Sequence, residues 1–592
     1  MISKNLFNFH IPVMGLAYTI DSPIRVAHLG ISSVISIMDD ELIERVNAYY
    51  SKQFALPYNE TTTKELDYRA RRITNYLNTV NRIVKEKFNS FKNLILEETN
   101  HLFDFMNLLP KSSDLKKDIQ NYLDGHLSIN ELRSYLEEKF SPGSIDVNIM
   151  TKVDREQYEK KEKLAEIYND AHAALRGFAK STVHGSVVLS AGMNPKLYSY
   201  FEDFDCFYPD ENGQIEKKVI LKVSDYRSAY IQGQQLAKRG IWVSEYRIES
   251  GLNCGGHAFA TDGQLFGMIL EEFKNKRKQL EQTTFEMLCK ALEDKHRTIP
   301  KNRLPIQITA QGGVGTSEEH NFLLQHYGID SVGWGSPFLL VPEATSTDKA
   351  TRDLLAHAKE EDLYLSSISP LGIPFNTIKG MSNERFRLER IAKGRPGSSC
   401  PRKYLALDKT YDTEGTCTAS RKHQELSLAL LEKRKNAYSK EVYQRMHEEI
   451  TEKSCLCIGL ANAALMDLKL PIKGEDQGIV ICPGPNIAYF TKEATLQQMI
   501  AHINGDYNLI ETPSRPHFFI KELDMYMQHY HKQQEEASKD GNSVKLKKLK
   551  FFQANLLNSI NYYIELFTNE QFFFTNQKSM LLAYLENTKK QL

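Results

Sequence analysis

The sequence has no surplus of either charge and no long apolar run. Its 592 residues carry 75 Lys and Arg against 75 Asp and Glu. A dedicated nucleic-acid-binding protein usually has an obvious basic excess, so nucleic acid is not an expected partner, although a local basic patch stays open. No apolar signal segment follows Met1–Leu6, and no stretch approaches the ~20 apolar residues that span a bilayer. These absences favour a cytoplasmic protein with no membrane partner.

Cysteine is also scarce, since eight residues in a chain of this length do not make a disulfide framework. No Cys-x-x-Cys pair occurs, and no internal repeat is visible. Four cysteines nevertheless fall close together in the chain: Cys400, Cys417, Cys455 and Cys457. Four thiolates could hold an iron–sulfur cluster or a zinc ion. Core cysteines with one chance Cys-x-Cys pair are the alternative.

Short apolar runs alternate with helical segments through the first part of the chain. The strand candidates are residues 11–17, 31–37, 145–150, 185–190, 217–223, 240–246, 305–310 and 329–336. Helices are expected at 22–30, near 155–180, and over 224–239, 263–294 and 317–327. Such alternation predicts a parallel α/β fold, and eight units suit a (β/α)8 TIM barrel. A doubly wound open sheet is the alternative.

Residues 40 to about 140 interrupt this rhythm after the second strand. They are rich in Glu, Lys, Asn and Leu, and apolar residues recur there at helical spacing, as at Leu66, Ala70 and Ile73. We therefore expect a helical insertion in the barrel.

The last third of the chain has a different pattern. Pro370–Pro374 is expected to be the linker out of a barrel domain that covers residues 1–380. Residues 381–592 are then a mainly helical C-terminal region, whose aromatic residues, such as Phe551 and Phe552, predict a packing face. The aromatic tail also leaves a homo-oligomer open.

The most informative motif runs from Gly251 to His257, directly after a strand candidate. Gly255 and Gly256 lack a Cβ, so the backbone there could approach a planar or anionic ligand closely. His257 can move a proton near neutral pH. A strand followed by a glycine pair and a base is typical of a cofactor-binding βα loop, although a loop histidine without chemistry is the alternative.

Glycine also occurs at the ends of the last two strand candidates. Gly312 and Gly313 stand at the end of the seventh, and Gly335 and Ser336 at the end of the eighth. In TIM barrels the loops after strands seven and eight often bind a phosphate through free backbone N–H groups. Tight βα turns without a ligand are the alternative.

Taken together, these segments resemble the nitronate monooxygenase family, formerly called 2-nitropropane dioxygenases, which are FMN-dependent TIM barrels. The similarity is carried, in chain order, by the segments Ile11–Gly15, Asp146–Met150, Ile220–Val223, Gly251–His257, Ala310–Val314 and Gly333–Phe338. The resemblance implies a barrel that binds FMN and acts on a small molecule.

The resemblance also implies roles for individual residues. It places Met14 and Gly15 beside the flavin, Asn148 at the ring edge, and Lys222 near the ring or its phosphate. His257 would be the catalytic base. The glycine pair, Gly255 and Gly256, precedes it, and the two phosphate loops would contain Gly312, Gly313, Gly335 and Ser336. Asn253 and Cys254 stand where the family usually has Glu-Ala, and Cys254 is expected to pack rather than react.

Three functions follow. The leading expectation is an FMN-dependent monooxygenase acting on nitronates. A flavin enoyl reductase of lipid or polyketide synthesis is the rival, since the family has such relatives. A barrel that has lost catalysis and serves as a binding module is the third.

Overall fold

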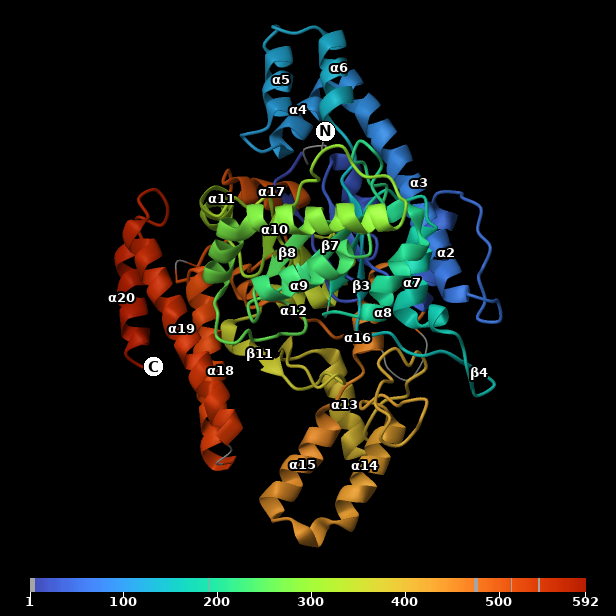
Figure 1. Ribbon diagram of the computed structural model, residues 1–592, viewed down its shortest axis with the longest axis vertical. Coiled ribbons are helices and arrows are strands. Elements are labelled where there is room, and N and C mark those ends of the chain that lie inside the picture. Colours follow the sequence, from blue (N-terminus) through green and yellow to red (C-terminus); the bar gives the residue numbers. More distant parts are fainter. Residues whose placement is uncertain (1–5, 191, 473–477, 513, 541–542) are drawn as a thin grey trace.

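A parallel eight-stranded sheet forms the centre of the protein and closes on itself. The computed structural model describes residues 6–190, 192–472, 478–512, 514–540 and 543–592. In spatial order the strands are β1 (Phe9–His10), β10 (Ser331–Gly333), β9 (Gln307–Gln311), β8 (Val243–Glu249), β7 (Lys218–Val223), β6 (Ser186–Ser190), β3 (Ile145–Met150) and β2 (Ser33–Ser36). The Ile11 N–H donates to the Ser32 carbonyl at 2.9 Å, which joins the β1 end of the sheet to the β2 end. The predicted (β/α)8 TIM barrel is confirmed, and the open sheet is wrong (Figure 1).

Two strand boundaries differ from the prediction. The opening strand is only β1 with a single further bridge at Ile11, and residues 12–17 form the loop after it. Pro12 has no N–H to donate to a neighbouring strand, and Gly15 has φ +54, so the chain leaves the sheet there. The strand predicted at 240–246 begins three residues later, because Gly240 has φ +81 and ends the preceding helix. That shift places Glu249 at the carboxyl end of β8.

Helices cover the outside of the barrel. They are α1 (Ser22–Val26), α2 (Asp40–Gln53), α7 (Asp170–Ala179), α8 (Pro195–Tyr200), α9 (Tyr226–Ala237), α10 (Phe266–Asp294), α11 (Ser317–His326) and α12 (Lys349–Ala356). The helix expected near 155–180 is confirmed only over α7. Its first part is instead a small antiparallel hairpin of β4 (Tyr158–Glu159) and β5 (Glu162–Lys163).

The interruption after β2 is helical, as predicted. It contains α2 followed by α3 (Tyr68–Glu97), α4 (Thr99–Leu108), α5 (Asp114–Leu123) and α6 (Ile129–Lys139). The last three project from one end of the molecule (Figure 1). Two buried ion pairs connect the first two helices of the insertion: the Asp40 carboxylate on α2 accepts from Arg69 at 2.6 Å and from Arg72 at 2.9 Å, both on α3.

The interior of the barrel has a central apolar layer. Successive strand residues face opposite sides of a sheet, so alternate residues point inward. Val34, Val188 and Ile220 form a small cluster with Val13, separate from the main core under the helices. Polar and charged side chains lie on either side of this layer, towards the two ends of the barrel.

The region after the barrel begins with an antiparallel hairpin rather than a linker. Its strands are β11 (Leu363–Ser366) and β12 (Phe375–Ile378), and Pro370–Pro374 lies in the loop between them. The linker prediction is wrong because a Pro- and Gly-rich stretch suits a chain reversal equally well, and Gly372 has φ +70. The division of the chain at residue 380 stays a prediction, and residues 1–5 lie outside the described part.

The rest of the chain is helical, as expected. The helices are α13 (Ser382–Ala392), α14 (Arg421–Lys433), α15 (Lys440–Glu452), α16 (Leu456–Asp467), α17 (Leu496–Asn504), α18 (Phe518–Asp540), α19 (Ser543–Asn569) and α20 (Lys578–Lys589). In Figure 1, α14 and α15 form an arm opposite α5 and α6, and α18 to α20 flank the barrel. None of the helices in the described residues is long and apolar enough to cross a membrane.

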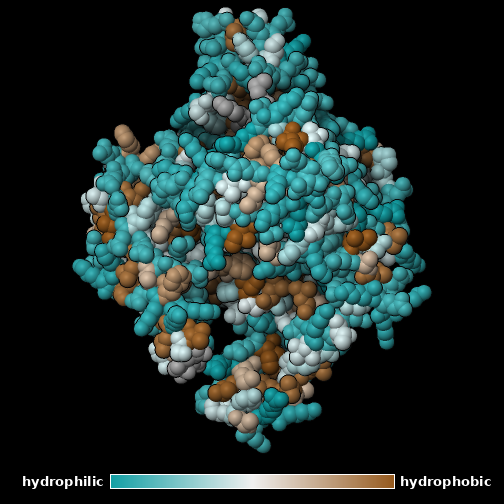
Figure 2. Space-filling model, in the orientation of Figure 1, coloured by the Kyte–Doolittle hydropathy of each residue, from teal (hydrophilic) through white to brown (hydrophobic). Residues whose placement is uncertain are grey.

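The aromatic tail divides between core and surface. Phe552 and Tyr563 are buried, as a packing face requires, whereas Phe572 is 87% exposed. Figure 2 shows a mostly hydrophilic face with apolar residues gathered around β11, and the surface is hollowed between α18 and the α14–α15 arm.

Candidate active site at the carboxyl ends of the strands

His257 is held in place by the hairpin that follows the barrel. It lies eight residues after β8 and forms an isolated antiparallel bridge with Phe375 of β12. On either side of this bridge, the Ala258 N–H donates to the Pro374 carbonyl and the Asn376 N–H donates to the Gly256 carbonyl, both at 2.9 Å. The loop carrying the predicted base is therefore fixed on a short strand-like pairing.

The His257 imidazole is neutral at physiological pH. Burial, with a smaller contribution from the Lys222 ammonium, lowers its pKa to about 4. Its Nε2 lies 2.7 Å from the Ser369 hydroxyl oxygen, which also accepts the Leu371 N–H at 3.2 Å. Ser369 is fully buried, so the ring has a fixed polar partner on one side.

A cluster of polar side chains lies inside the barrel next to His257. The Lys222 ammonium on β7 contacts the Glu249 carboxylate on β8 at 2.8 Å. The Gln311 side-chain amide on β9 donates to the same carboxylate at 2.9 Å. On β3, the Asn148 side-chain oxygen is buried and has no hydrogen-bond partner among the described residues. Predicted residues Lys222 and Asn148 thus face the barrel interior, and one of them presents an unused acceptor.

The two glycines of the pair have different surroundings. A Cβ on Gly255 would collide with the Cys482 carbonyl oxygen. That carbonyl accepts the Gly256 N–H at 3.1 Å. A side chain at position 255 would therefore be blocked, whereas a Cβ on Gly256 would meet open space, and ligand binding by this pair stays a prediction. The lack of a side chain at Gly255 is explained by the close approach of a segment far along the chain.

We call residues 478–490 the cover segment, because they cross the carboxyl end of the barrel. The Gly484 N–H donates to the Ser336 hydroxyl at 2.6 Å, and the Asn486 amide donates to the Val314 carbonyl at 2.9 Å. Near its start, the Val480 carbonyl accepts the Tyr18 hydroxyl at 2.5 Å. The cover segment therefore contacts the loops after β1, β8, β9 and β10.

The two predicted phosphate turns lie side by side. They follow β9 and β10, which are adjacent and pair Gln311 with Gly333. Among the described residues, the N–H groups of Gly313, Val314 and Gly335 have no hydrogen-bond acceptor. The turn after β9 needs glycine, since Gly312 and Gly313 have φ +128 and +78. Free N–H groups on adjacent turns can bind an anion.

The loop after β9 is also packed by the predicted histidine loop. A Cβ on Gly313 would collide with the Asn253 side chain, and one on Gly312 would meet the Cys254 sulfur at 2.8 Å. Burial, followed by the nearby Glu249 carboxylate, raises the pKa of the Cys254 thiol well above its usual value. The thiol is therefore protonated and packed, in keeping with the expected packing role.

The opening loop contributes Met14 and Gly15. Met14 lies beside Gly335, since a Cβ there would be 3.9 Å from the Met14 sulfur. A Cβ on Gly15 would instead meet Tyr18 at 2.9 Å and Leu460 of α16 at 3.2 Å. Met14 thus belongs to the same end of the barrel as the phosphate turns, and Gly15 packs away from it against the C-terminal region.

Two features at this end of the barrel suit the phosphate and the ring edge of FMN. Free N–H donors lie on the two adjacent turns, and the Asn148 acceptor lies unpaired inside the barrel. Anion binding by N–H groups and ring-edge hydrogen bonding are what a flavin mononucleotide requires.

The cysteine cluster finds less support. Cys400 and Cys417 contact each other through their thiols, which lowers the pKa of Cys400 to about 7, and Cys455 and Cys457 are buried nearby on the chain. Among the described residues, no group of three or more His, Cys, Asp or Glu side chains is arranged to hold a metal ion. The iron–sulfur or zinc site stays a prediction without structural support.

Three parts of the candidate site were not predicted from the sequence: Glu249, Ser369 and the cover segment. Glu249 carries a signal, because Glu245, Arg247 and Glu249 alternate with apolar residues along β8 and therefore all face inward. Ser369 and the cover segment carry no local signal, since they reach the site only through the fold of the C-terminal region.

Comparisons with known proteins add little. No family model matches the chain, and no curated protein matches it. Solved structures match the chain only at low identity. FabK from Thermotoga maritima is 12% identical, with a TM-score of 0.37 and coverage of 85% of this chain and 94% of that chain. The enoyl reductase domain of MlnA from Bacillus amyloliquefaciens is 15% identical, with a TM-score of 0.33 and coverage of 74% and 89%. Nitroalkane oxidase from Streptomyces ansochromogenes is 10% identical, with a TM-score of 0.34 and coverage of 84% and 96%. Likenesses this distant leave the chain's activity to be argued from its own residues.

Proposed function

We propose that the chain is an FMN-dependent oxidoreductase of the nitronate monooxygenase type, with His257 as its base. The observation that carries the proposal is the half-buried His257 with its lowered pKa beside Lys222, at the same end of the barrel as the two turns with free N–H groups. The turns around Gly312–Gly313 and Gly335–Ser336 would hold the phosphate. Asn148 and Lys222 would face the ring, and Met14 would line the same end. When bound, FMN supplies the redox chemistry of the reaction.

The step assigned to the protein is removal of a proton from the carbon next to the substrate's nitro group. In the tautomer that carries its proton on Nε2, His257 donates to the Ser369 hydroxyl oxygen 2.7 Å away, and the Nδ1 lone pair takes the proton. The Lys222 ammonium, paired with Glu249, places positive charge near the nitro oxygens and stabilises the charge that develops on them.

The protonation state of His257 favours this activity over the rival enoyl reductase. A reductase of this design needs the histidine to donate a proton to the reduced carbon, so the imidazole must begin protonated. Because the pKa of His257 is about 4, little of the imidazolium form, which is the stronger proton donor, is present near neutral pH. A base, by contrast, must begin neutral, as this ring does.

The first test is the visible absorption spectrum of the purified full-length protein, followed by mass identification of the small molecule it releases. Flavin absorbance and release of FMN are expected. Oxygen uptake with a nitroalkane or nitronate, without a nicotinamide donor, then identifies the oxygenase. Turnover of an enoyl thioester that requires a nicotinamide donor would identify the reductase instead.

Replacement of the base completes the test. His257→Ala should lower turnover about 10²- to 10⁴-fold, the usual contribution of a positioned base. His126→Ala is the matched control, because His126 is exposed in the helical insertion far along the chain from the site. Equal activity of both variants would refute the assigned base, and absence of bound flavin would refute the cofactor.

A further inference from the structure

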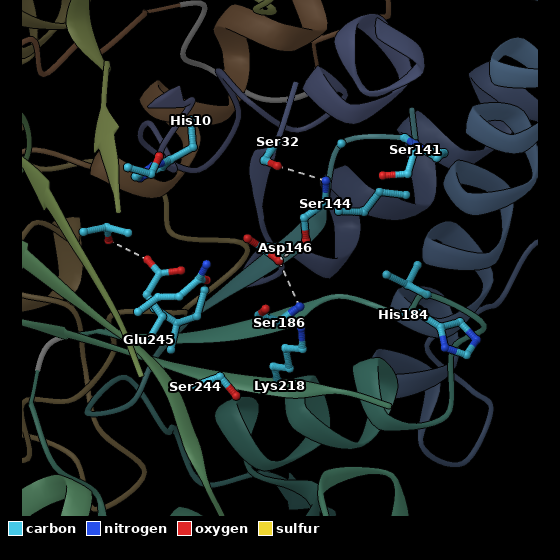
Figure 3. Close-up of a pocket in the computed structure, with 18 of the residues that line it drawn as sticks. His10, Ser32, Ser141, Ser144, Asp146, His184, Ser186, Lys218, Ser244 and Glu245 are labelled. Atoms are coloured by element: carbon cyan, nitrogen blue, oxygen red, sulfur yellow. Dashed lines mark hydrogen bonds between the residues drawn. The ribbon is translucent and has the colours of Figure 1, made fainter. Parts of the chain in front are cut away.

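A second polar site lies at the opposite end of the barrel, where the strands begin. A cavity of about 350 Å³ opens there (Figure 3). Its polar lining includes Lys85, Asp146, Ser186, Lys218, Glu245 and Arg247. Apart from Lys85 and its neighbours on α3, the lining comes from all eight barrel strands or the turns that lead into them. In Figure 3 the side chains of Asp146, Ser186 and Glu245 gather around one space, with His184 at its edge.

The inner wall of this cavity is charged and buried. The Arg247 Nε donates to the Glu245 carboxylate at 2.8 Å, and the same carboxylate accepts the Thr309 hydroxyl at 2.5 Å. Asp146 accepts the Ser144 hydroxyl at 2.6 Å and the Ser186 N–H at 2.9 Å. Burial raises the pKa of Asp146 above its usual value, although the Arg247 charge opposes this. Each carboxylate is thus already well supplied with donors.

Arg247 keeps unused donors inside the cavity. Its side chain is only 4% exposed, yet among the described residues only its Nε has a hydrogen-bond acceptor. A guanidinium has five N–H donors, so its two terminal nitrogens are left to bond whatever fills the cavity. The Ser186 hydroxyl, likewise more than nine-tenths buried, has no partner in the described part of the chain. A buried guanidinium whose terminal N–H groups have no protein acceptor is typical of a site that binds an oxyanion.

The charges of the lining favour the same class of ligand. Three cations, Lys85, Lys218 and Arg247, face two carboxylates, Asp146 and Glu245. Lys85 and Lys218 stand at the exposed rim, where they attract anions from solvent. The remaining polar wall is dominated by serine hydroxyls, which exchange hydrogen bonds with other hydroxyl groups. A volume of this size also lies within the range of small-molecule sites.

We propose that this cavity binds a small hydroxylated anion, whose carboxylate or phosphate pairs with Arg247 while its hydroxyls contact the serine-lined wall. The central apolar layer of Val34, Val188 and Ile220 lies between this cavity and the carboxyl end of the barrel. The site is therefore distinct from the one assigned to FMN, and it does not depend on the proposed function.

Isothermal titration of the full-length protein tests the proposal. The probes are glycerol 3-phosphate and glycerate, with glycerol as the uncharged match, all at one ionic strength. One or both anions should bind saturably with one site per chain, and glycerol should not bind. The anion that binds more tightly, glycerol 3-phosphate or glycerate, shows whether the site prefers a phosphate or a carboxylate.

Variants locate the binding. Lys218→Met should weaken it severalfold, and Lys238→Met, the same change at an exposed position at the end of α9, should leave it unchanged. The double variant Glu245→Gln/Arg247→Gln removes both buried charges together and should weaken binding at least tenfold or so, the loss expected for charge-assisted hydrogen bonds. Ser186→Ala should weaken it severalfold without changing any charge. Absence of saturable binding of both anions, or binding unchanged by Lys218→Met and Ser186→Ala, overturns the proposal.

Discussion

The buried ion pair between Arg515 and Glu319 fixes the C-terminal region on the loop after β9, and its removal is the sharpest test of that contact. The Arg515 guanidinium donates to Glu319 at 2.7 and 2.9 Å, and one of its nitrogens also donates to the Gly313 carbonyl at 2.9 Å. Both side chains are almost fully buried. Removing one partner of such a pair typically costs about 3–5 kcal/mol, because the other charge is left buried and uncompensated. Arg515→Leu should lower the free energy of unfolding by about that amount.

The pH dependence of this loss follows from Glu319. Burial alone would raise the pKa of the carboxyl, but Arg515, then His517, and the N–H donors around it hold the pKa below its usual value. A carboxyl with a depressed folded pKa contributes stability above its unfolded pKa, about 4.3, and this stability is lost as the pH falls through the folded value. In Arg515→Leu the cation that offsets the burial of Glu319 is gone, so the pKa of this carboxyl rises and its protonation relieves part of the loss. The difference between wild type and variant should therefore be largest near neutral pH and shrink as the pH falls, beginning above the unfolded pKa of about 4.3.

Urea unfolding followed by far-ultraviolet circular dichroism measures the effect, and Arg434→Leu is the matched control at an exposed position on the C-terminal arm. Hydrogen exchange of the cover segment and of residues 312–316 adds a local readout, since these should lose protection together. A loss below about 1 kcal/mol, or one equal to the control's, would contradict the reasoning, because exposed pairs contribute no more than that.

Three further predictions concern the candidate active site. First, kcat/KM for the nitronate reaction should be flat between pH 5 and 8 and fall only towards pH 4, since the base must be neutral and the pKa of His257 is about 4; a fall centred near 6.5 would show an unshifted histidine. Second, Gly255→Ala should displace the cover segment, because the new Cβ meets the Cys482 carbonyl, and should lower both thermal stability and turnover, whereas Gly125→Ala on the exposed insertion should spare turnover. Third, Cys254→Ala should change turnover less than about threefold, since its thiol is protonated and packed; a loss near that of His257→Ala would assign it chemistry. Each is measured by steady-state kinetics on purified protein, with the Gly255 variant also followed by thermal unfolding.

Much of the barrel could be predicted because its strands are buried on both faces. Runs such as Val219–Val223 and Val187–Leu189 are continuously apolar or nearly so, and they stand out against polar helices. Strand β1 was misplaced since a strand of two residues leaves almost no pattern, and the apolar run after it belongs to a loop covered by the C-terminal region.

The sequence predicted only those parts of the candidate site that lie at or soon after the end of a barrel strand. His257, Lys222 and the turns after β9 and β10 lie at strand ends, so position along the chain indicates position in the barrel. The partners that shape them are distant: Gly484 lies 148 residues from Ser336, and Ser369 lies 112 residues from His257. Contacts of that separation depend on how the C-terminal helices pack, which no short pattern in the sequence encodes.

The cover segment has a consequence for the order in which the protein matures during translation. All eight barrel strands have left the ribosome well before residues 478–490 are made, so a nascent chain can close its barrel while Gly255, Ser336 and Val314 still face solvent. Arg515 and its partner Glu319 join later still. Should the chain bind FMN as proposed, the cofactor would enter the barrel during synthesis, before residues 478–490 cover it, and flavin supplied during expression would load the protein more fully than flavin added to the finished protein.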